Sequence, residues 1–128
     1  MNLQTALFLL PHDLRRRLFA RLNPPRFAFL RERRAQGDPT SYSYQPFDHT
    51  RSIFIHVPKA AGVSVSRALY GREVGGHTTA AMYALTYSAD EFKSYFKFTF
   101  VRNPWDRLFS AFRFLKSGGT NEADRRWA

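Results

Sequence analysis

The sequence predicts an α/β fold, in which helices flank a parallel sheet and a basic helical arm precedes it. Two short runs, residues 52–57 and 97–101, are rich in β-branched and aromatic residues and have the length of strands. A loop and a helical pattern follow each run, and strands that alternate with helices favour a parallel sheet. The 128 residues suit one domain, with an arm and linker at residues 1–41 and a core at residues 42–128.

The composition limits the classes of function. The absence of cysteine excludes disulfides, cysteine nucleophiles and thiolate metal sites. Twenty Lys and Arg against ten Asp and Glu give a net charge of +10. This surplus indicates an anionic partner: phosphate or sulfate groups, nucleic acid, a polyanionic sugar or an acidic membrane. Hydrophobic residues make up 44% of the chain and include 13 Phe, so we expect a folded core built on phenylalanine.

No apolar run reaches the roughly 20 residues that a membrane-spanning helix needs. The apolar run at residues 6–10 is stopped by Pro11, His12 and Asp13. A signal peptide has its basic residues before the apolar run, whereas here they follow it. We therefore expect a soluble, cytoplasmic protein.

The arm carries much of the positive charge, because residues 1–35 contain eight Arg and only two acidic residues. Leu and Phe recur at helical spacing over residues 14–22 and predict an amphipathic helix that ends at Pro24. A second short helix is predicted over residues 27–34 and a loop over residues 37–41. The arm could pack its apolar stripe on the core and expose its Arg, or it could contact an anionic membrane or polyanion.

The first half of the core contains one strand and two helices. Residues 42–50 are expected to be irregular, because Pro46 disfavours a strand interior. After the first strand, a helix over residues 63–70 should end at Gly71. A turn then leads into a short helix over residues 80–85.

The second half of the core has clear helix-capping signals. Ser88 and Glu91 have the spacing of a capping box, for a helix that ends near residue 95. After the second strand, Asn103 caps the last helix, Pro104 is its first residue, and residues 117–119 end it. The apolar face of this helix comprises Trp105, Leu108, Phe109, Phe112 and Leu115.

The first candidate site follows the first strand. Residues 58–64 read Pro-Lys-Ala-Ala-Gly-Val-Ser, so small residues lead from a buried strand into a helix. Unpaired backbone N–H groups and the helix dipole at such a start attract anions. Lys59 adds a cation and Ser64 a hydroxyl donor. The order differs from a Walker A loop, because the lysine precedes the glycine. The segment fits either an anion-binding loop or a plain tight turn.

The second candidate site follows the second strand. Arg102 stands at the strand's carboxyl end, where open α/β sheets bind ligands. Ser110 lies two turns into the next helix, off its apolar stripe. The two side chains could grip one phosphate together, since guanidinium suits a bidentate phosphate contact. The alternative is an Arg102 that pairs with Asp106 on the surface, and a solvated serine.

These two segments resemble the carbohydrate sulfotransferases that use 3′-phosphoadenosine 5′-phosphosulfate (PAPS). The resemblance rests on His-Val-Pro-Lys-Ala-Ala-Gly-Val-Ser at residues 56–64 and Phe-Val-Arg-Asn-Pro-Trp-Asp-Arg-Leu-Phe-Ser-Ala-Phe at residues 100–112. It covers roughly residues 50–120, over half of the chain. Soluble, bacterial-type members of sulfotransferase family 2, similar to heparan sulfate sulfotransferases, are a closer likeness than the family's membrane-anchored Golgi members.

The resemblance implies a P-loop-like parallel sheet and transfer of a sulfuryl group from PAPS to a carbohydrate hydroxyl, without a metal. It implies that Arg102 and Ser110 bind the 3′-phosphate. It also implies that the phosphosulfate is held by Pro58, Lys59, Ala60, Ala61, Gly62, Val63 and Ser64.

The resemblance also points to His77 as the catalytic base. Members similar to heparan sulfotransferases place a catalytic histidine after a glycine between the two motifs, and His77 follows Gly76 there. A neutral imidazole can take a hydroxyl proton near pH 7. Glu73 is the next candidate base, or an orienting residue. His56 is expected inside the strand, held by a hydrogen bond. Lys59 would stabilise the charge on the leaving phosphate.

Two other functions stay open at this point. A P-loop nucleotide phosphotransferase would use a Gly-Lys-Ser/Thr loop and a magnesium-binding Asp. A non-catalytic basic module would bind nucleic acid or a polyanion through the arm. The family's domain normally continues well beyond the second motif, so we expect the core of this chain to be partial at its C-terminus.

Overall fold

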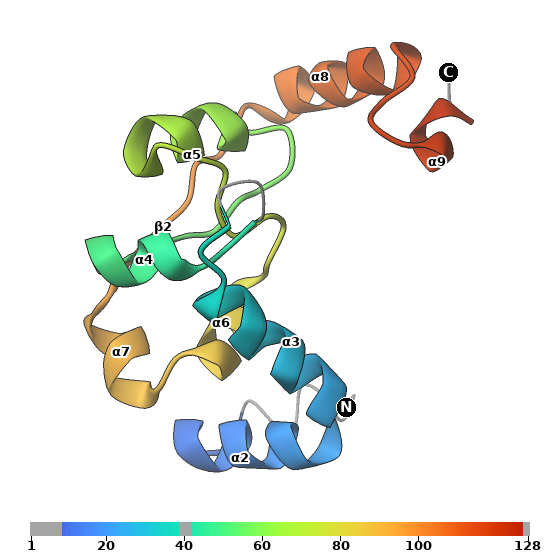
Figure 1. Cartoon of the computed structure of the whole chain (residues 1–128). Helices are drawn as coiled ribbons and strands as arrows, with labels where there is room; N and C mark the ends of the chain where they lie inside the picture. Colours follow the sequence, from blue (N-terminus) through green and yellow to red (C-terminus); the bar gives the residue numbers. More distant parts are fainter. Residues whose placement is uncertain (1–8, 39–41, 127–128) are drawn as a thin grey trace.

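The computed structural model describes residues 9–38 and 42–126, and residues 6–8 of the apolar run at residues 6–10 lie outside this range. The molecule is elongated (Figure 1). Helices α2 and α3 form one end, a small sheet lies in the middle, and α8 and α9 extend away at the other end. Within the described residues, no helix is long and apolar enough to cross a membrane.

Two helices form the N-terminal part, as the sequence predicts. They are α2 (His12–Leu22) and α3 (Pro24–Ala35). The proline pair ends α2 and also supplies the first residues of α3, where a missing N–H costs nothing. Phe19 of α2 and Leu30 of α3 are buried in the hydrophobic core. Both helices pack against α6 (Ala80–Thr86).

Residues 42–50 are not wholly irregular, and that prediction is wrong in part. Helix α4 spans Gln45–Thr50 and carries Pro46 in its first turn. Proline is tolerated there because the first N–H groups of a helix have no intrahelical partner. Arg51 ends α4 in the left-handed conformation, at φ 50°, and the chain then enters the first strand.

The sheet has two parallel strands within the described residues, β1 (Ser52–Phe54) and β2 (Phe96–Phe98). Ile53 is opposite Lys97 in the register. The order of helices and strands and the parallel pairing confirm a mixed α/β architecture. Both strands are shorter than predicted, and β2 begins one residue earlier. Beyond Phe98 the chain leaves the pair, and Val101 is 83% exposed.

The remaining helices begin and end close to their predicted limits. Helix α5 (Gly62–Tyr70) ends at Gly71, which has φ 71°. Helix α7 (Ala89–Ser94) starts with the predicted capping box. Helix α8 (Pro104–Lys116) starts with the predicted Asn103 cap. A short α9 (Glu122–Arg125) lies in the tail, where no helix was expected.

Tyrosine shares the core with phenylalanine, which corrects the expectation of a phenylalanine core. Tyr44, Tyr83 and Tyr87 are each at most 1% exposed. Among the phenylalanines in the described part of the chain, only Phe19, Phe47 and Phe54 are buried. The other buried hydrophobic residues of this cluster are Leu30, Ile53, Val74, Leu85 and Tyr95. This core supports the sheet whose strand ends carry the candidate site.

Candidate functional site

The loop between β1 and α5 has two non-glycine residues in an unusual backbone conformation. Lys59 and Ala61 adopt the left-handed conformation, with φ of 62° and 61°. Such backbone strain in non-glycine residues concentrates at functional sites. Ala61 is the residue before α5, and no side chain caps that helix. The first N–H groups of α5 therefore keep their capacity to bind an anion. Ala60 is buried, at 4% exposure, and supports the loop from inside.

Gly62 makes room for a histidine at the start of α5. A Cβ atom on Gly62 would lie 1.8 Å from Nε2 of His56. Any larger residue would push the imidazole away, so glycine is needed for this packing. The prediction that His56 lies inside the strand is wrong, because β1 ends at Phe54. His56 instead enters the space beside the loop.

His56 contacts His77, the candidate base. The two ring centroids are 4.8 Å apart in an edge-to-face arrangement. Burial, and secondarily the nearby His77, lowers the pKa of His56 below its ordinary value of 6.5. His56 is therefore neutral at pH 7. His77 itself is exposed and accessible to a ligand.

Helix α8 brings the second motif to the loop. The Arg107 guanidinium donates from Nε to the Pro58 carbonyl at 2.9 Å. Nζ of Lys59 lies 3.9 Å from the centroid of the Phe114 ring, a cation–π contact. These two contacts join α8 to the segment after β1. Ser110, on the same helix, is half-buried.

One cavity of about 670 Å³ unites the predicted site residues. Its walls include residues from the loop, from the start of α5, from the turn before α6 and from α8. The predicted residues that line it are Pro58, Lys59, Ala61, Gly62, Val63, Ser64, Glu73, His77, Arg102 and Ser110. Ala60 is the one predicted site residue that does not line it. The structure thus brings together two motifs that lie about 40 residues apart.

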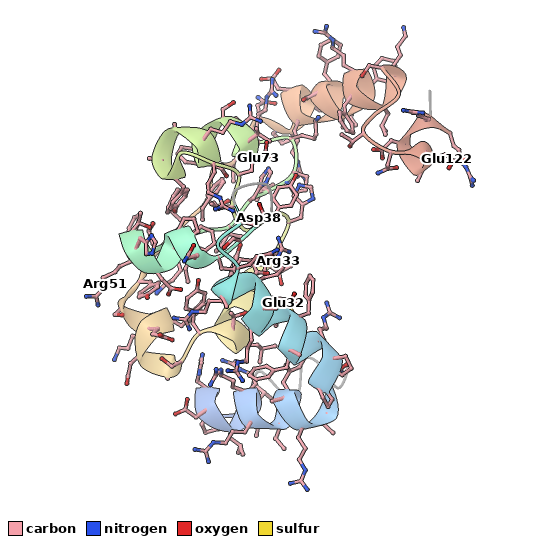
Figure 2. All side chains as sticks on the ribbon, viewed as in Figure 1. Glu32, Arg33, Asp38, Arg51, Glu73 and Glu122 are labelled. Atoms are coloured by element: carbon pink, nitrogen blue, oxygen red, sulfur yellow. The ribbon has the colours of Figure 1, made fainter. Side chains whose placement is uncertain are left out.

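The cavity also contains residues that sequence reasoning missed. His56, Tyr42 and Arg33 line it. Arg33 comes from α3, so the N-terminal helices contribute to the site, and Figure 2 shows it at the end of α3 nearest the middle of the molecule. A long-range contact of this kind leaves no local signal in the sequence. For His56, the sequence signal that could have indicated its position is Gly62, because a glycine at the start of a helix leaves room for a neighbouring side chain.

The charge of the cavity is positive. Lys59, Arg33 and Arg102 line it, against Glu73 as its acidic side chain. Glu73 is held by an ion pair in which Nη2 of Arg67 lies 2.7 Å from its Oε1. A hydrogen bond to Glu73 raises the pKa of Tyr42. The cavity suits an anionic ligand. No group of three His, Asp or Glu side chains among the described residues is placed to hold a metal ion.

Among the described residues, Arg102 forms no ion pair with Asp106, which was the alternative to a phosphate contact. Arg102 is exposed at the cavity.

No curated protein and no solved structure matches the chain. The family model of the sulfotransferases, however, matches residues 46–123, a range that runs from α4 through α8 and contains both motifs. This match covers more than half of the chain, which therefore belongs to the sulfotransferase family.

Proposed function

We propose that the chain transfers a sulfuryl group from PAPS to a carbohydrate hydroxyl. One observation supports this most directly: the loop after β1, the residues after β2 and His77 all line one cavity. Cations and hydroxyl donors come from both strand ends, which suits a ligand that carries two separate anionic groups. A volume of about 670 Å³ is within the usual range for small-molecule sites.

The residues present fit the two ends of PAPS. The N–H groups at the start of α5, with Lys59 and Ser64, would hold the 5′-phosphosulfate. Arg102 and Ser110 would hold the 3′-phosphate, because guanidinium binds phosphate through two parallel hydrogen bonds. When bound there, PAPS supplies the sulfuryl group for transfer. Pro58, Ala60, Ala61, Gly62 and Val63 would shape the loop around it.

The proposed reaction is an in-line displacement at sulfur. His77 takes the proton of the acceptor hydroxyl, whose oxygen forms the new bond to sulfur. The old S–O bond breaks, and its electron pair stays on the phosphate oxygen. Lys59 and the loop amides stabilise the charge that develops there. The products are the sulfated sugar and adenosine 3′,5′-bisphosphate.

The surroundings favour His77 over its rivals as the base. Glu73 is engaged by Arg67 and by Tyr42, so its carboxylate is already held. His56 is partly buried and packs on His77, which suits an orienting role. His77 is exposed on the cavity, where an acceptor hydroxyl can reach it.

The test is ligand-dependent thermal unfolding with adenosine 3′,5′-bisphosphate, AMP and ATP. We expect the bisphosphate to raise the midpoint of unfolding more than either other nucleotide, because it alone carries the 3′-phosphate. Arg102→Ala should reduce this preference. The matched control is Lys116→Ala, which removes an exposed cation from α8 outside the cavity.

The other outcomes reject the proposal and identify its rivals. A preference for ATP that requires Mg²⁺ would indicate a nucleotide phosphotransferase. No response to any nucleotide, together with salt-sensitive binding of DNA, would indicate a basic nucleic-acid-binding module.

A further inference from the structure

Helix α2 turns only part of its surface toward the rest of the molecule. It packs on α3 and α6, with Phe19 buried in the core. Arg15 lines a cavity of about 600 Å³ between α2, α3 and α6. Arg16 donates from Nε to the Leu85 carbonyl of α6 at 3.1 Å. The helix forms one end of the molecule (Figure 1), so its other side can contact a partner.

The solvent-facing side of α2 carries a row of leucines. Leu14, Leu18 and Leu22 are four residues apart, so they lie along one side of the helix. Leu14 is 47% exposed and Leu22 is 62% exposed, whereas Leu18 is half-buried. None of the three lines the cavity between α2, α3 and α6. Single exposed leucines are ordinary on a protein surface, but a row of them on one helix indicates a surface for binding.

Arginines run beside this leucine row. Arg17 and Arg21 each follow a leucine of the row by three residues, which places them on the same side of the helix. Both are exposed, and neither takes part in an ion pair among the described residues. The acidic residue of α2, Asp13, lies at the start of the helix beside His12. The outward side of α2 therefore combines apolar side chains with positive charge.

This combination fits an anionic lipid surface better than it fits another polyanion. An interfacial helix places its apolar side chains at the boundary between headgroups and acyl chains, while its cations reach the lipid phosphates. The positive charge of α2 complements the negative potential of such a surface. A nucleic acid or a polyanionic sugar would neutralise the arginines but would leave the leucines in water. The leucine row therefore favours a membrane.

We propose that α2 lies on the surface of an anionic membrane. Leu14, Leu18 and Leu22 enter the boundary of the acyl chains, and Arg17 and Arg21 contact the phosphates of the headgroups. The chain is held at the surface by one short helix, without a segment that crosses the bilayer. One short helix gives a reversible contact, because its buried apolar area is small.

The membrane contact goes beyond the proposed sulfuryl transfer and does not depend on it. Helix α2 precedes the region that the sulfotransferase family model matches, residues 46–123. None of the leucines and arginines of this side lines the proposed donor cavity. Figure 2 shows Glu73, which lines that cavity, well away from α2. A membrane under α2 therefore leaves the donor cavity accessible.

The test is co-sedimentation of the full chain with vesicles of two compositions. One is phosphatidylcholine alone, and the other is phosphatidylcholine with about one third phosphatidylglycerol. We expect the chain to bind the anionic vesicles at least about tenfold more tightly than the neutral ones. The affinity for the anionic vesicles should fall as the salt concentration rises, because salt screens the arginines.

Variants locate the contact on α2. Arg21→Gln should weaken binding to the anionic vesicles about fivefold, since one cation near an anionic surface contributes roughly this factor. The double variant Leu14→Gln, Leu22→Gln should weaken it about tenfold, because apolar side chains hold the helix in the interface. Glutamine keeps the helix propensity, and all three positions are exposed, so the fold should be retained. Circular dichroism checks this.

The matched controls lie on α8, at the opposite end of the molecule (Figure 1). Lys116→Gln removes an exposed cation, and Leu108→Gln removes a leucine that is 63% exposed. Each should change the affinity for the anionic vesicles by less than about twofold, because both positions are far from the proposed contact.

The other outcomes overturn the proposal. Equal binding to both kinds of vesicle, or to neither, would remove the anionic membrane as the partner. Equal losses in Arg21→Gln and Lys116→Gln would mean diffuse attraction to the net positive charge. Unchanged binding by the double leucine variant would mean a purely electrostatic contact, as a nucleic acid or polyanionic sugar would make. A loss in Leu108→Gln alone would place the contact on α8. The proposed function has its own test with the bisphosphate and stands or fails separately.

Discussion

Lys59 and Arg102 line one cavity from two different strand ends, so their loss should have different kinetic effects. Lys59→Ala should lower kcat about 100-fold, on the order of 3 kcal/mol of transition-state stabilisation, with little change in nucleotide affinity. Arg102→Ala should mainly raise the dissociation constant for adenosine 3′,5′-bisphosphate, about tenfold. Steady-state kinetics and calorimetry would measure both. Normal sulfate transfer by both variants would show that the assignment is wrong.

His56 should make stability depend on pH. Burial lowers its pKa in the folded protein, below the 6.5 of the unfolded chain. Between these two values the unfolded chain binds more protons, so the free energy of unfolding falls as the pH falls below about 6.5. Urea unfolding from pH 7.5 to 5 should show this loss. His56→Gln should flatten it, whereas His49→Gln, at an exposed histidine, should not. An unchanged slope in His56→Gln would contradict the burial argument.

At the scale of elements, Arg34 joins three helices. Its Nη2 lies 2.8 Å from Asp48 on α4 and 2.7 Å from Glu91 on α7, and its guanidinium carbon lies 4.4 Å from the centroid of the Tyr87 ring. Removal of one partner from a partly buried network leaves the other charges unpaired. Arg34→Ala should therefore lower the free energy of unfolding by about 2 kcal/mol. The control, Arg31→Ala on the same helix, should have little effect.

The same network predicts an acid-sensitive component of stability. The hydrogen bond from Arg34 is the main cause that lowers the pKa of Glu91, from 4.5 to about 2. The resulting stabilisation is complete above pH 4.5 and is lost as the pH falls toward 2. Arg34→Ala should weaken this dependence, in a pH range well below that of His56. Identical acid unfolding curves for the variant and the parent would refute it.

Elements whose limits are set by neighbouring residues could be predicted from the sequence. Elements whose limits depend on packing or pairing with distant residues were predicted less accurately. Ser88 and Asn103 cap their helices as expected, because capping involves only neighbouring residues. The strands were predicted too long, since the length of a strand depends on what pairs with it. Phe98 is the last residue paired with β1, although Phe100 and Val101 have equal β propensity. Helix α4 has no clear local signal, because a proline such as Pro46 disfavours a strand interior but is equally suited to the first turn of a helix.

At the scale of the whole molecule, the two cavities differ in the same way: one is built from local sequence motifs, and the other depends on contacts between distant segments. The cavity for the proposed donor is built from two contiguous motifs, and both could be read from the sequence. The cavity between α2, α3 and α6 depends on how α2 and α3 pack on α6. Arg26 and His77 are about 50 residues apart, and no spacing pattern links them. The arm could be predicted as basic and helical, but the position of its arginines beside the candidate base required the fold.

Helix α8 presents its apolar face to solvent. Trp105 is 78% exposed, and Leu108, Phe109 and Phe112 are each more than half exposed. Figure 1 shows this helix extending away from the body of the molecule. The helix therefore contributes to the site through Ser110 and Phe114 rather than to the core. An apolar surface of this kind is unusual for a monomer.

The exposure of this face gives a prediction about stability. Trp105→Ser should change the free energy of unfolding by no more than about 0.5 kcal/mol, because the indole is already in water. Phe47→Ala should cost about 3 kcal/mol, since Phe47 is fully buried in the core. Urea unfolding at two protein concentrations measures both. If Trp105→Ser instead lowered stability by more than about 1 kcal/mol, and did so only at the higher concentration, the face would be covered by a second copy of the chain in solution.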